Sequence, residues 1–174
     1  MFSDIYDDSE WLIQLVENLL SVTRIENGEM QLNKSPEVVG DVVEEALKHV
    51  DRNKSVHDIR VIQPEDIIIA NMDAKLIIQV MINLVNNAIK YTQKGSMIRI
   101  SYGDGGEMIY VSIADNGPGM DENAKEHAFD MFYTGQNMVA DGKRSMGLGL
   151  ALCKSVVEAH GGKIDITDNM PHGC

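Results

Sequence analysis

The stretch that decides the fold is "DAKLIIQVMINLVNNAIKYT", residues 73–92. At about 100° per residue, its apolar side chains fill one broad face of a helix. Asp73 precedes the periodic residues and is a favourable N-cap. The spacing therefore predicts a helix over 73–92, capped by Asp73, whose buried face is formed by Ile77, Ile78, Met81, Ile82, Leu84, Val85, Ala88 and Ile89.

The other face of this predicted helix is rich in amides: Gln79, Asn83, Asn86 and Asn87 lie there, with Lys90. Asparagine is a poor helix former, so this clustering indicates a role other than solvation. Asn83 and Asn87 are one turn apart, so their side chains project side by side. Neutral amide oxygens can ligate a hard cation such as Mg²⁺ while phosphates supply the negative charge. The alternative is an ordinary surface helix with unfavourable residues.

A second informative stretch is "ADNGPGM", residues 114–120, which follows an apolar run. Asp115 ends a predicted strand, where its carboxylate could accept a hydrogen bond from an exocyclic amine. Gly117 and Gly119 would let the main chain approach a flat ring. A simple turn between a strand and a helix explains the same composition, so this stretch alone leaves both interpretations open.

A third stretch is "SMGLGLALCK", residues 145–154, in which Gly147 and Gly149 open a predicted helix. The free N–H groups and positive dipole end of such a helix suit phosphate, and Lys143 and Arg144 come just before it. Glycines also permit tight helix packing, so this pattern is weak when taken alone.

The rest of the chain alternates between helical and extended patterns. Helices are predicted over 9–28 (with Ser9 as N-cap), 36–50, 121–132 and 148–160, strands over 29–35, 57–63, 67–72 and 163–168, and a hairpin over 96–115 that turns at 104–106. The segment 133–146 has little periodicity and is predicted to be mobile. Together these elements predict an α/β two-layer sandwich, a mixed and mostly antiparallel sheet with helices on one face, plus an N-terminal helix.

Composition narrows the possible functions. The chain has 174 residues, 44% of them hydrophobic, and a net charge of −12. The acidic balance argues against nucleic acid as a partner but not against a nucleotide ligand. Cys153 and Cys174 form no disulfide framework or zinc motif, and we expect a reducing compartment. We recognise no signal peptide and no segment apolar enough to span a bilayer.

In combination, these stretches resemble the ATP-binding domain of sensor histidine kinases. "NLVNNAIKYT" (83–92) is similar to the N box, "DNGPGM" (115–120) to the G1 box, "FDMFYTG" (129–135) to the F box and "GLGLALC" (147–153) to the G2 box. Within the family, the chain looks most like the potassium-responsive sensor kinases. The resemblance implies two parts: residues 1–33, the second helix of the dimerisation domain and a linker, and residues 34–174, the ATP-binding catalytic domain.

The family implies a Bergerat-type sandwich that holds ATP and Mg²⁺ between helices and sheet. Asn87 would ligate Mg²⁺ with help from Asn83, directly or through water, and Lys90 would reach a phosphate. Asn83 and Lys90 are thus the expected catalytic residues. The other residues expected at the phosphates are Lys143, Arg144, Gly147, Leu148 and Gly149.

The resemblance also implies an adenine site and a lid. Asp115 would accept a hydrogen bond from the adenine amino group, with Tyr91, Gly117 and Gly119 close by. Phe129 and Phe132 would anchor a lid over 133–146, although simple core packing would also explain these two phenylalanines.

Three departures from the family pattern stand out. Ser145 occupies the position of the first G2 glycine. The chain ends in "PHGC", where the family continues into a last strand, so we expect the sheet to lack an edge strand. No histidine lies in the family's histidine–acid box, and we expect the phosphoacceptor helix to be absent. The histidines present, expected to be surface or packing residues, are His49, His57, His127, His160 and His172.

The leading functional hypothesis is the catalytic part of a histidine kinase, which passes the ATP γ-phosphoryl to a histidine for relay to a response regulator. We expect a homodimeric full-length protein, of which this chain is a cytoplasmic portion of a bacterial inner-membrane sensor. An ATP hydrolase like gyrase, Hsp90 or MutL would carry a glutamate at the position of Asn83, and an amide cannot act as the base. A non-catalytic nucleotide-binding module is the third hypothesis, with Ser145 as its support.

Overall fold

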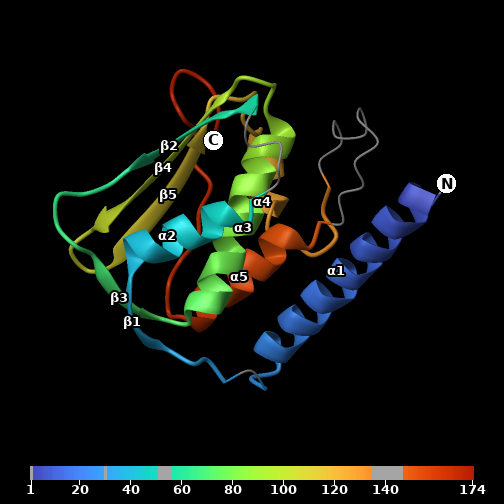
Figure 1. The fold of residues 1–174 in the computed structure, drawn as a ribbon, viewed down its shortest axis with the longest axis horizontal. Helices are drawn as coiled ribbons and strands as arrows, with labels where there is room; N and C mark the ends of the chain where they lie inside the picture. Colours follow the sequence, from blue (N-terminus) through green and yellow to red (C-terminus); the bar gives the residue numbers. More distant parts are fainter. Residues whose placement is uncertain (1, 30, 51–55, 135–146) are drawn as a thin grey trace.

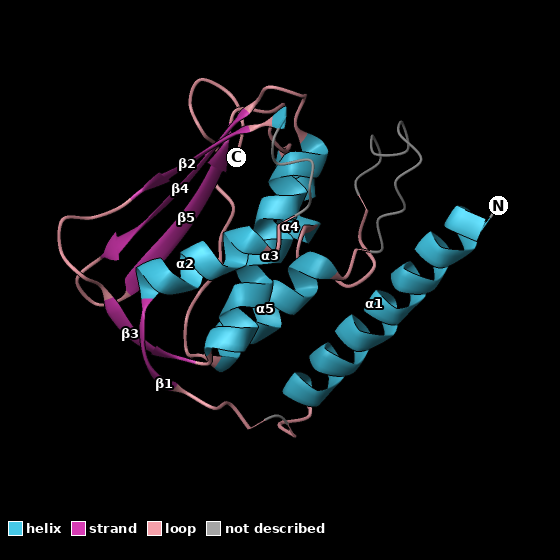
Figure 2. Ribbon diagram, viewed as in Figure 1, coloured by secondary structure: helices cyan, strands magenta, loops and turns pink. Residues whose placement is uncertain are grey.

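The computed structural model describes residues 2–29, 31–50, 56–134 and 147–174. Helices and strands alternate along most of the chain (Figures 1 and 2). In chain order they are α1 Phe2–Glu26, β1 Ser35–Val38, α2 Val39–Lys48, β2 Asp58–Ile62, β3 Ile69–Met72, α3 Ala74–Tyr91, β4 Met97–Asp104, β5 Ile109–Asp115, α4 Glu122–His127 and α5 Gly149–Ala159.

The strands form two sheets. In the larger sheet the order is β2-β4-β5, with β2 parallel and β5 antiparallel to β4, and β1 pairs antiparallel with β3 in the smaller one. Helices α2, α3 and α5 lie on one side of the larger sheet, and α1 runs beside α5 on the side away from it (Figure 1). The predicted sandwich, with a mixed and mostly antiparallel sheet and an N-terminal helix, is confirmed.

Two apolar clusters hold α3 in place. Toward the sheet, Val85 of α3 packs in a cluster with the fully buried Ile98 and Ile100 of β4, which point to the same face because strand side chains alternate. Away from the sheet, Val80 of α3 packs with Leu152 of α5 and Val22 of α1. Because α3 is buried on two sides, its position fixes the polar residues that it carries. Its predicted N-cap is also confirmed, since the Asp73 carboxylate accepts a hydrogen bond from the N–H of Leu76.

Helix α1 is longer than predicted and only partly packed. It begins at Phe2, so the prediction of Ser9 as N-cap was wrong. No proline or glycine interrupts residues 2–8, and serine inside a helix has only a small cost. Val22 is fully buried against α5, whereas Ile13 and Val16 are more than half exposed. The C-terminal half of α1 is therefore part of the domain core, and the proposed division at residue 33 stays a prediction.

The entry into α2 also differs from the prediction. Of the described residues in the strand predicted over 29–35, only Ser35 is extended in a ladder. Pro36 does not begin a helix but lies in β1 opposite Asn71. Proline is tolerated there because β1 has a free edge and needs no N–H on that side. The helix begins three residues later, at Val39, whose N–H donates to the Ile68 oxygen.

Two further predictions were wrong. The segment 163–168 forms no strand (Figure 2), although its alternation is real, since Ile164 and Ile166 are half-buried between exposed neighbours. Alternating burial thus occurs without ladder hydrogen bonds. The helix predicted over 121–132 ends at His127, because the chain then turns through Phe132, whose φ is 64°. Most of the segment predicted to be mobile, 135–146, lies outside the described residues.

Candidate functional site

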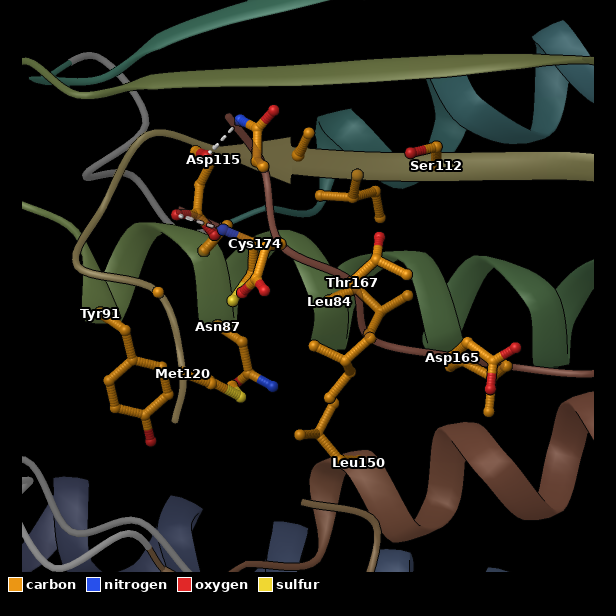
Figure 3. A pocket seen from close by; sticks show the side chains of 18 of the residues that line it. Leu84, Asn87, Tyr91, Ser112, Asp115, Met120, Leu150, Asp165, Thr167 and Cys174 are labelled. Atoms are coloured by element: carbon orange, nitrogen blue, oxygen red, sulfur yellow. Dashed lines mark hydrogen bonds between the residues drawn. The ribbon is translucent and has the colours of Figure 1, made fainter. Parts of the chain in front are cut away.

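A cavity of about 760 Å³ lies between α3, the edge of β5 and the segment 163–169 (Figure 3). All five residues 111–115 of β5 line it. Since successive strand side chains point to opposite faces, the cavity must run along the edge of the strand. Its volume lies within the usual range for small-molecule sites. The predicted site residues that line it are Asn87, Lys90, Tyr91, Asp115, Gly119 and Phe129.

Helix α3 supplies the polar wall of the cavity. Asn87, Lys90 and Tyr91 are three and four residues apart, so they share one face of the helix, and all three line the cavity. Asn87 and Tyr91 both lie on the side of α3 that faces Met120 (Figure 3). The Lys90 ammonium lies 5.3 Å from the centroid of the Tyr91 ring, within range of a cation–π contact. This wall therefore offers a cation, an aromatic face and an amide oxygen.

Asn83 does not line the cavity with Asn87. It faces α5 instead: its Cγ lies 4.0 Å from the position that a Cβ on Gly149 would occupy. Burial raises the pKa of the neighbouring Cys153 thiol to about 12. The Asn83 Nδ2 atom is buried and finds no hydrogen-bond partner within the described part of the chain. The two amides that spacing places side by side thus meet different neighbours.

Asp115, the last residue of β5, is held from both sides. Its Oδ1 accepts hydrogen bonds from the N–H of Gly117 at 2.8 Å and of Cys174 at 3.5 Å. Its own N–H donates to the Cys174 oxygen at 2.7 Å, and its oxygen accepts from Nδ2 of Asn169 at 2.6 Å. Among the residues that the structure describes, none donates to Oδ2. Within the described ranges, the second carboxylate oxygen is therefore without a donor.

The two glycines after Asp115 are required by packing within the protein. A Cβ on Gly117 would lie 2.6 Å from Cγ2 of Thr92, just after the end of α3. Gly119 has a φ of 76°, and a Cβ there would lie 3.2 Å from the Gly173 oxygen. Close approach to the protein's own chain thus explains both positions, and Gly119 also lines the cavity.

The start of α5 lies beside Phe132, so the two ends of the predicted lid meet there. At Gly147 φ is 64°, and a Cβ would collide with the Tyr133 oxygen. Leu148 is fully buried and, as the N-cap of α5, makes no side-chain hydrogen bond to its first turn. Phe132 is 61% exposed and does not line the cavity, but its N–H donates to the Gly147 oxygen at 2.9 Å, which joins the two ends of the predicted lid. Lys143, Arg144 and Ser145 lie outside the described residues.

Sequence reasoning missed several residues that line the cavity. Arg99 and Lys163 bring positive charge to it, although the whole chain is acidic. Arg99 stands between two buried isoleucines, and this alternation could have marked it as a residue of the other strand face. The segment after α5 adds Asp168 and Asn169, for which the sequence offered no signal, because their place depends on how that segment returns across the cavity.

Two further observations concern the described chain as a whole. Within the ranges that the structure describes, no three histidine, cysteine, aspartate or glutamate residues are placed to hold a metal ion by themselves. In the same ranges, no helix is both long and apolar enough to cross a membrane.

A sandwich with a cavity between a helix and the edge of the sheet is the architecture of nucleotide-binding domains of the ATPase and kinase class. The chain belongs to the family described as histidine kinase-, DNA gyrase B-, and HSP90-like ATPase, whose model matches residues 72–174, and within it the chain has the ATP-binding domain of sensor histidine kinases. The resemblance found in the sequence is confirmed.

Individual relatives agree with this assignment. The chain is 44% identical over its full length to "Sensor protein KdpD" of Clostridium acetobutylicum, and 35% identical over 92% of its length to "Sensor protein KdpD" of Escherichia coli. It spans only 19% and 17% of those two proteins. Among solved structures, the Acinetobacter baumannii histidine kinase AdeS is similar with a TM-score of 0.74 and 26% identity, over 91% of this chain and 72% of that one.

Proposed function

We propose that the cavity binds ATP together with Mg²⁺, and that the chain supplies the catalytic part of a sensor histidine kinase. The observation that carries the proposal is that Asn87 of α3 and Asp115 of β5 line one cavity. They come from distant parts of the sequence, and an amide oxygen and a carboxylate suit the two ends of a metal-bound nucleotide.

The adenine would lie at the Asp115 end of the cavity. The carboxylate keeps Oδ2 available, and a purine 6-amino group could donate to it. The ring of Tyr91 offers an apolar face on the opposite wall, and Gly117 and Gly119 form the turn beside it. A guanine would present a carbonyl oxygen to the carboxylate, leaving two acceptors unpaired at a cost of about 1–3 kcal/mol.

The phosphates and the metal would lie toward Asn87 and the start of α5. The Asn87 oxygen is a hard donor of the kind Mg²⁺ prefers. The described chain has no group of three histidine, cysteine, aspartate or glutamate ligands. The nucleotide phosphates would therefore supply most of the negative charge around the ion. When bound, it would neutralise charge on the transferred phosphoryl group. Lys90 would pair with a phosphate.

The start of α5 would hold the far phosphates. Its N-cap Leu148 makes no side-chain hydrogen bond to the first turn, so the main chain at Gly147, Leu148 and Gly149 would donate to an anion. Asn83, packed against α5, would act on the metal only through water. Lys143 and Arg144 remain predicted phosphate contacts.

In the complete protein, the γ-phosphoryl would pass to a histidine on a preceding helix. The bond from phosphorus to the β–γ bridging oxygen breaks, a phosphorus–nitrogen bond forms, and ADP leaves. The phosphoryl group then moves to an aspartate of a response regulator. We further propose that the full-length protein is a homodimer whose cytoplasmic portion includes this chain and whose sensor part lies in a bacterial inner membrane. The similarity to two sensor proteins supports this wider proposal.

Calorimetric titration with ATP, in the presence and absence of Mg²⁺, tests the proposal. We expect saturable binding of one nucleotide per chain that tightens when Mg²⁺ is added. ADP with Mg²⁺ serves as the comparison, since it lacks the γ-phosphate. No binding of ATP under either condition would reject the proposed function.

A further inference from the structure

The loop 168–174 closes over the end of β5. The N–H of Asn169 donates to the Gly173 oxygen at 3.0 Å, which makes the loop compact. Gly173 is buried with a φ of 115°, and a Cβ there would overlap the main-chain oxygen of Asp115. The loop therefore lies directly against the residue that we expect to recognise adenine.

Almost every polar atom of Asp115 is engaged by this loop. Cys174 accepts from its N–H and donates to its Oδ1, while the Asn169 side chain donates to its main-chain oxygen at 2.6 Å. Figure 3 shows the loop segment passing between the Asp115 end of β5 and helix α3. Asn169 is the only described residue of the loop that reaches Asp115 with its side chain, so it is the position at which a substitution can remove one bond and leave the main chain intact.

The loop is also anchored on its other side. Asp168 pairs with the ammonium of Lys125 at 2.8 Å, and Lys125 pairs with Glu122 in the same helix, α4, at 2.7 Å. The Lys125 side chain is only 14% exposed, but its partners Asp168 and Glu122 are 62% and 91% exposed, so solvent screens both pairs. Consecutive residues, Asp168 and Asn169, thus connect α4 to the end of β5.

We infer that Asn169 is a positioning residue that fixes the Asp115 carboxylate, and that it thereby sets the preference of the cavity for a purine with a 6-amino group. The inference rests on the proposed function. The free Oδ2 can favour an amine over a carbonyl only while its direction is fixed, and recognition sites need supporting contacts that hold such groups within about 0.5 Å. Asn169 acts on the carboxylate through the main chain of Asp115 and the loop: without its bond the Cys174 N–H would be held less firmly, and the Gly117 N–H alone would hold Oδ1.

The sharpest test is Asn169→Asp in the full 174-residue chain, because the two side chains have nearly the same shape. The variant replaces a donor by a carboxylate that faces the Asp115 oxygen. With Mg²⁺ present, we expect its affinity for ATP to fall by about 3- to 10-fold and its affinity for GTP to change by less than about 2-fold. Met170→Ala is the matched control, since this neighbouring side chain is 84% exposed. It should leave both affinities unchanged.

A second readout needs no nucleotide. The Gly117 N–H donates to Asp115 Oδ1, so its amide signal in a ¹H–¹⁵N spectrum reports on the carboxylate. We expect this signal to shift in Asn169→Asp and to stay in place in Met170→Ala. Lys125→Met frees Asp168 without changing the loop sequence, and we expect it to shift the Gly117 signal in the same direction by a smaller amount. If a thermal melt shows Asn169→Asp to be unfolded, Lys125→Met is used in its place.

The possible outcomes separate the two proposals. If the unchanged protein binds no ATP, the proposed function fails, while the Gly117 signal still tests the positioning role. If the protein prefers ATP and Asn169→Asp keeps both the wild-type ATP-to-GTP ratio and the Gly117 signal, the positioning role is overturned. If affinity for both nucleotides falls equally, Asn169 supports the fold and not the selectivity, and the inference is overturned as well.

Discussion

His160 joins the end of α5 to the start of α3: its Nε2 accepts a 3.0 Å hydrogen bond from the main-chain N–H of Asp73. Its Nδ1 lies 2.7 Å from the Val156 oxygen. Because a carbonyl can only accept, Nδ1 carries the proton, which leaves Nε2 free to accept. The Asp73 carboxylate in turn accepts from the N–H of Asn33, in the segment that follows α1.

We therefore expect His160→Ala to destabilise the protein. The substitution leaves the partly buried N–H of Asp73 without its acceptor, at a cost of about 1–3 kcal/mol in the free energy of unfolding. Urea denaturation would measure this. The control is His172→Ala, at an exposed position, which should stay within about 0.5 kcal/mol of wild type. Equal stabilities for the two variants would show that the contact between helices contributes nothing.

Asn87→Ala should separate metal-dependent from metal-independent binding. Its side chain lines the cavity and is the proposed Mg²⁺ ligand. We expect affinity for MgATP to fall by about tenfold, and affinity for metal-free ATP to fall much less. Titrations with Mg²⁺ and with a chelator give the two values. A loss of equal size in both conditions would remove the metal role from Asn87.

The two cysteines should differ in reactivity. Cys153 is fully buried, and burial raises its pKa to about 12. Cys174 is only partly buried, and burial, assisted by Asp115, also raises its pKa. Since the thiolate is the reactive form, a chromogenic disulfide reagent should modify Cys174 first and Cys153 only on unfolding. In Cys174→Ser the folded protein should release no colour until denaturant is added; rapid release there would contradict the buried position of Cys153.

His127 should make the stability of the protein depend on pH. A hydrogen bond to Asp130 raises the pKa of His127 above its usual value of 6.5. A raised pKa means that the folded state binds the proton more tightly, so this contribution is complete below pH 6.5 and is lost as the pH rises through the folded pKa.

The check is the melting temperature of wild type minus that of His127→Gln, followed from about pH 5.5 to about pH 8.5. This difference should shrink as the pH rises. His172→Gln, at an exposed site, provides the control and should give a difference that does not change. A difference in melting temperature that grows as the pH rises would contradict the prediction.

This chain should bind ATP without phosphorylating itself. Three of its histidines are poorly placed as acceptors: His160 has both ring nitrogens bonded, the two nitrogens of His57 are buried, and His127 is paired with Asp130. Hydrolysis should also be slow, because Asn83 cannot serve as a base.

Incubation with γ-labelled ATP and Mg²⁺, followed by an alkaline quench that preserves phosphohistidine, would test this. We expect no stoichiometric label on the chain alone and transfer to an added fragment that carries a histidine helix of a relative. Acid-labile label in stoichiometric amount would sink the prediction if it appeared on His49, His57, His127, His160 or His172.

What the sequence could predict was mostly local. The cap at Asp73 and the β4–β5 hairpin depend on neighbouring residues and are confirmed. The apolar face of α3 is confirmed in part: Met81, Val85, Ala88 and Ile89 are buried, but so is Val80, which the pattern did not place on that face. The start of α2 was missed because pairing of Pro36 with Asn71 outweighs the preference of proline for a first helical turn.

The candidate site shows the same limit. Asn87 and Asp115 could be selected from their positions on a helix face and at a strand end, and they do line one cavity. That Asn83 turns to α5 is decided by packing against Gly149 and Cys153, residues far away in the sequence. Asn169 and Lys125 were missed for a related reason, since their contacts depend on the return of the chain after α5.

Helix α5 has a mechanical consequence. Its 11 residues span about 16 Å, and a helix of that length is stiff along its axis. Leu150 in its first turn lines the cavity, while His160 at its end is tied to Asp73 and its oxygen accepts from Lys34. Helix α5 thus connects the segment that leaves α1 to the wall of the cavity as a single stiff element.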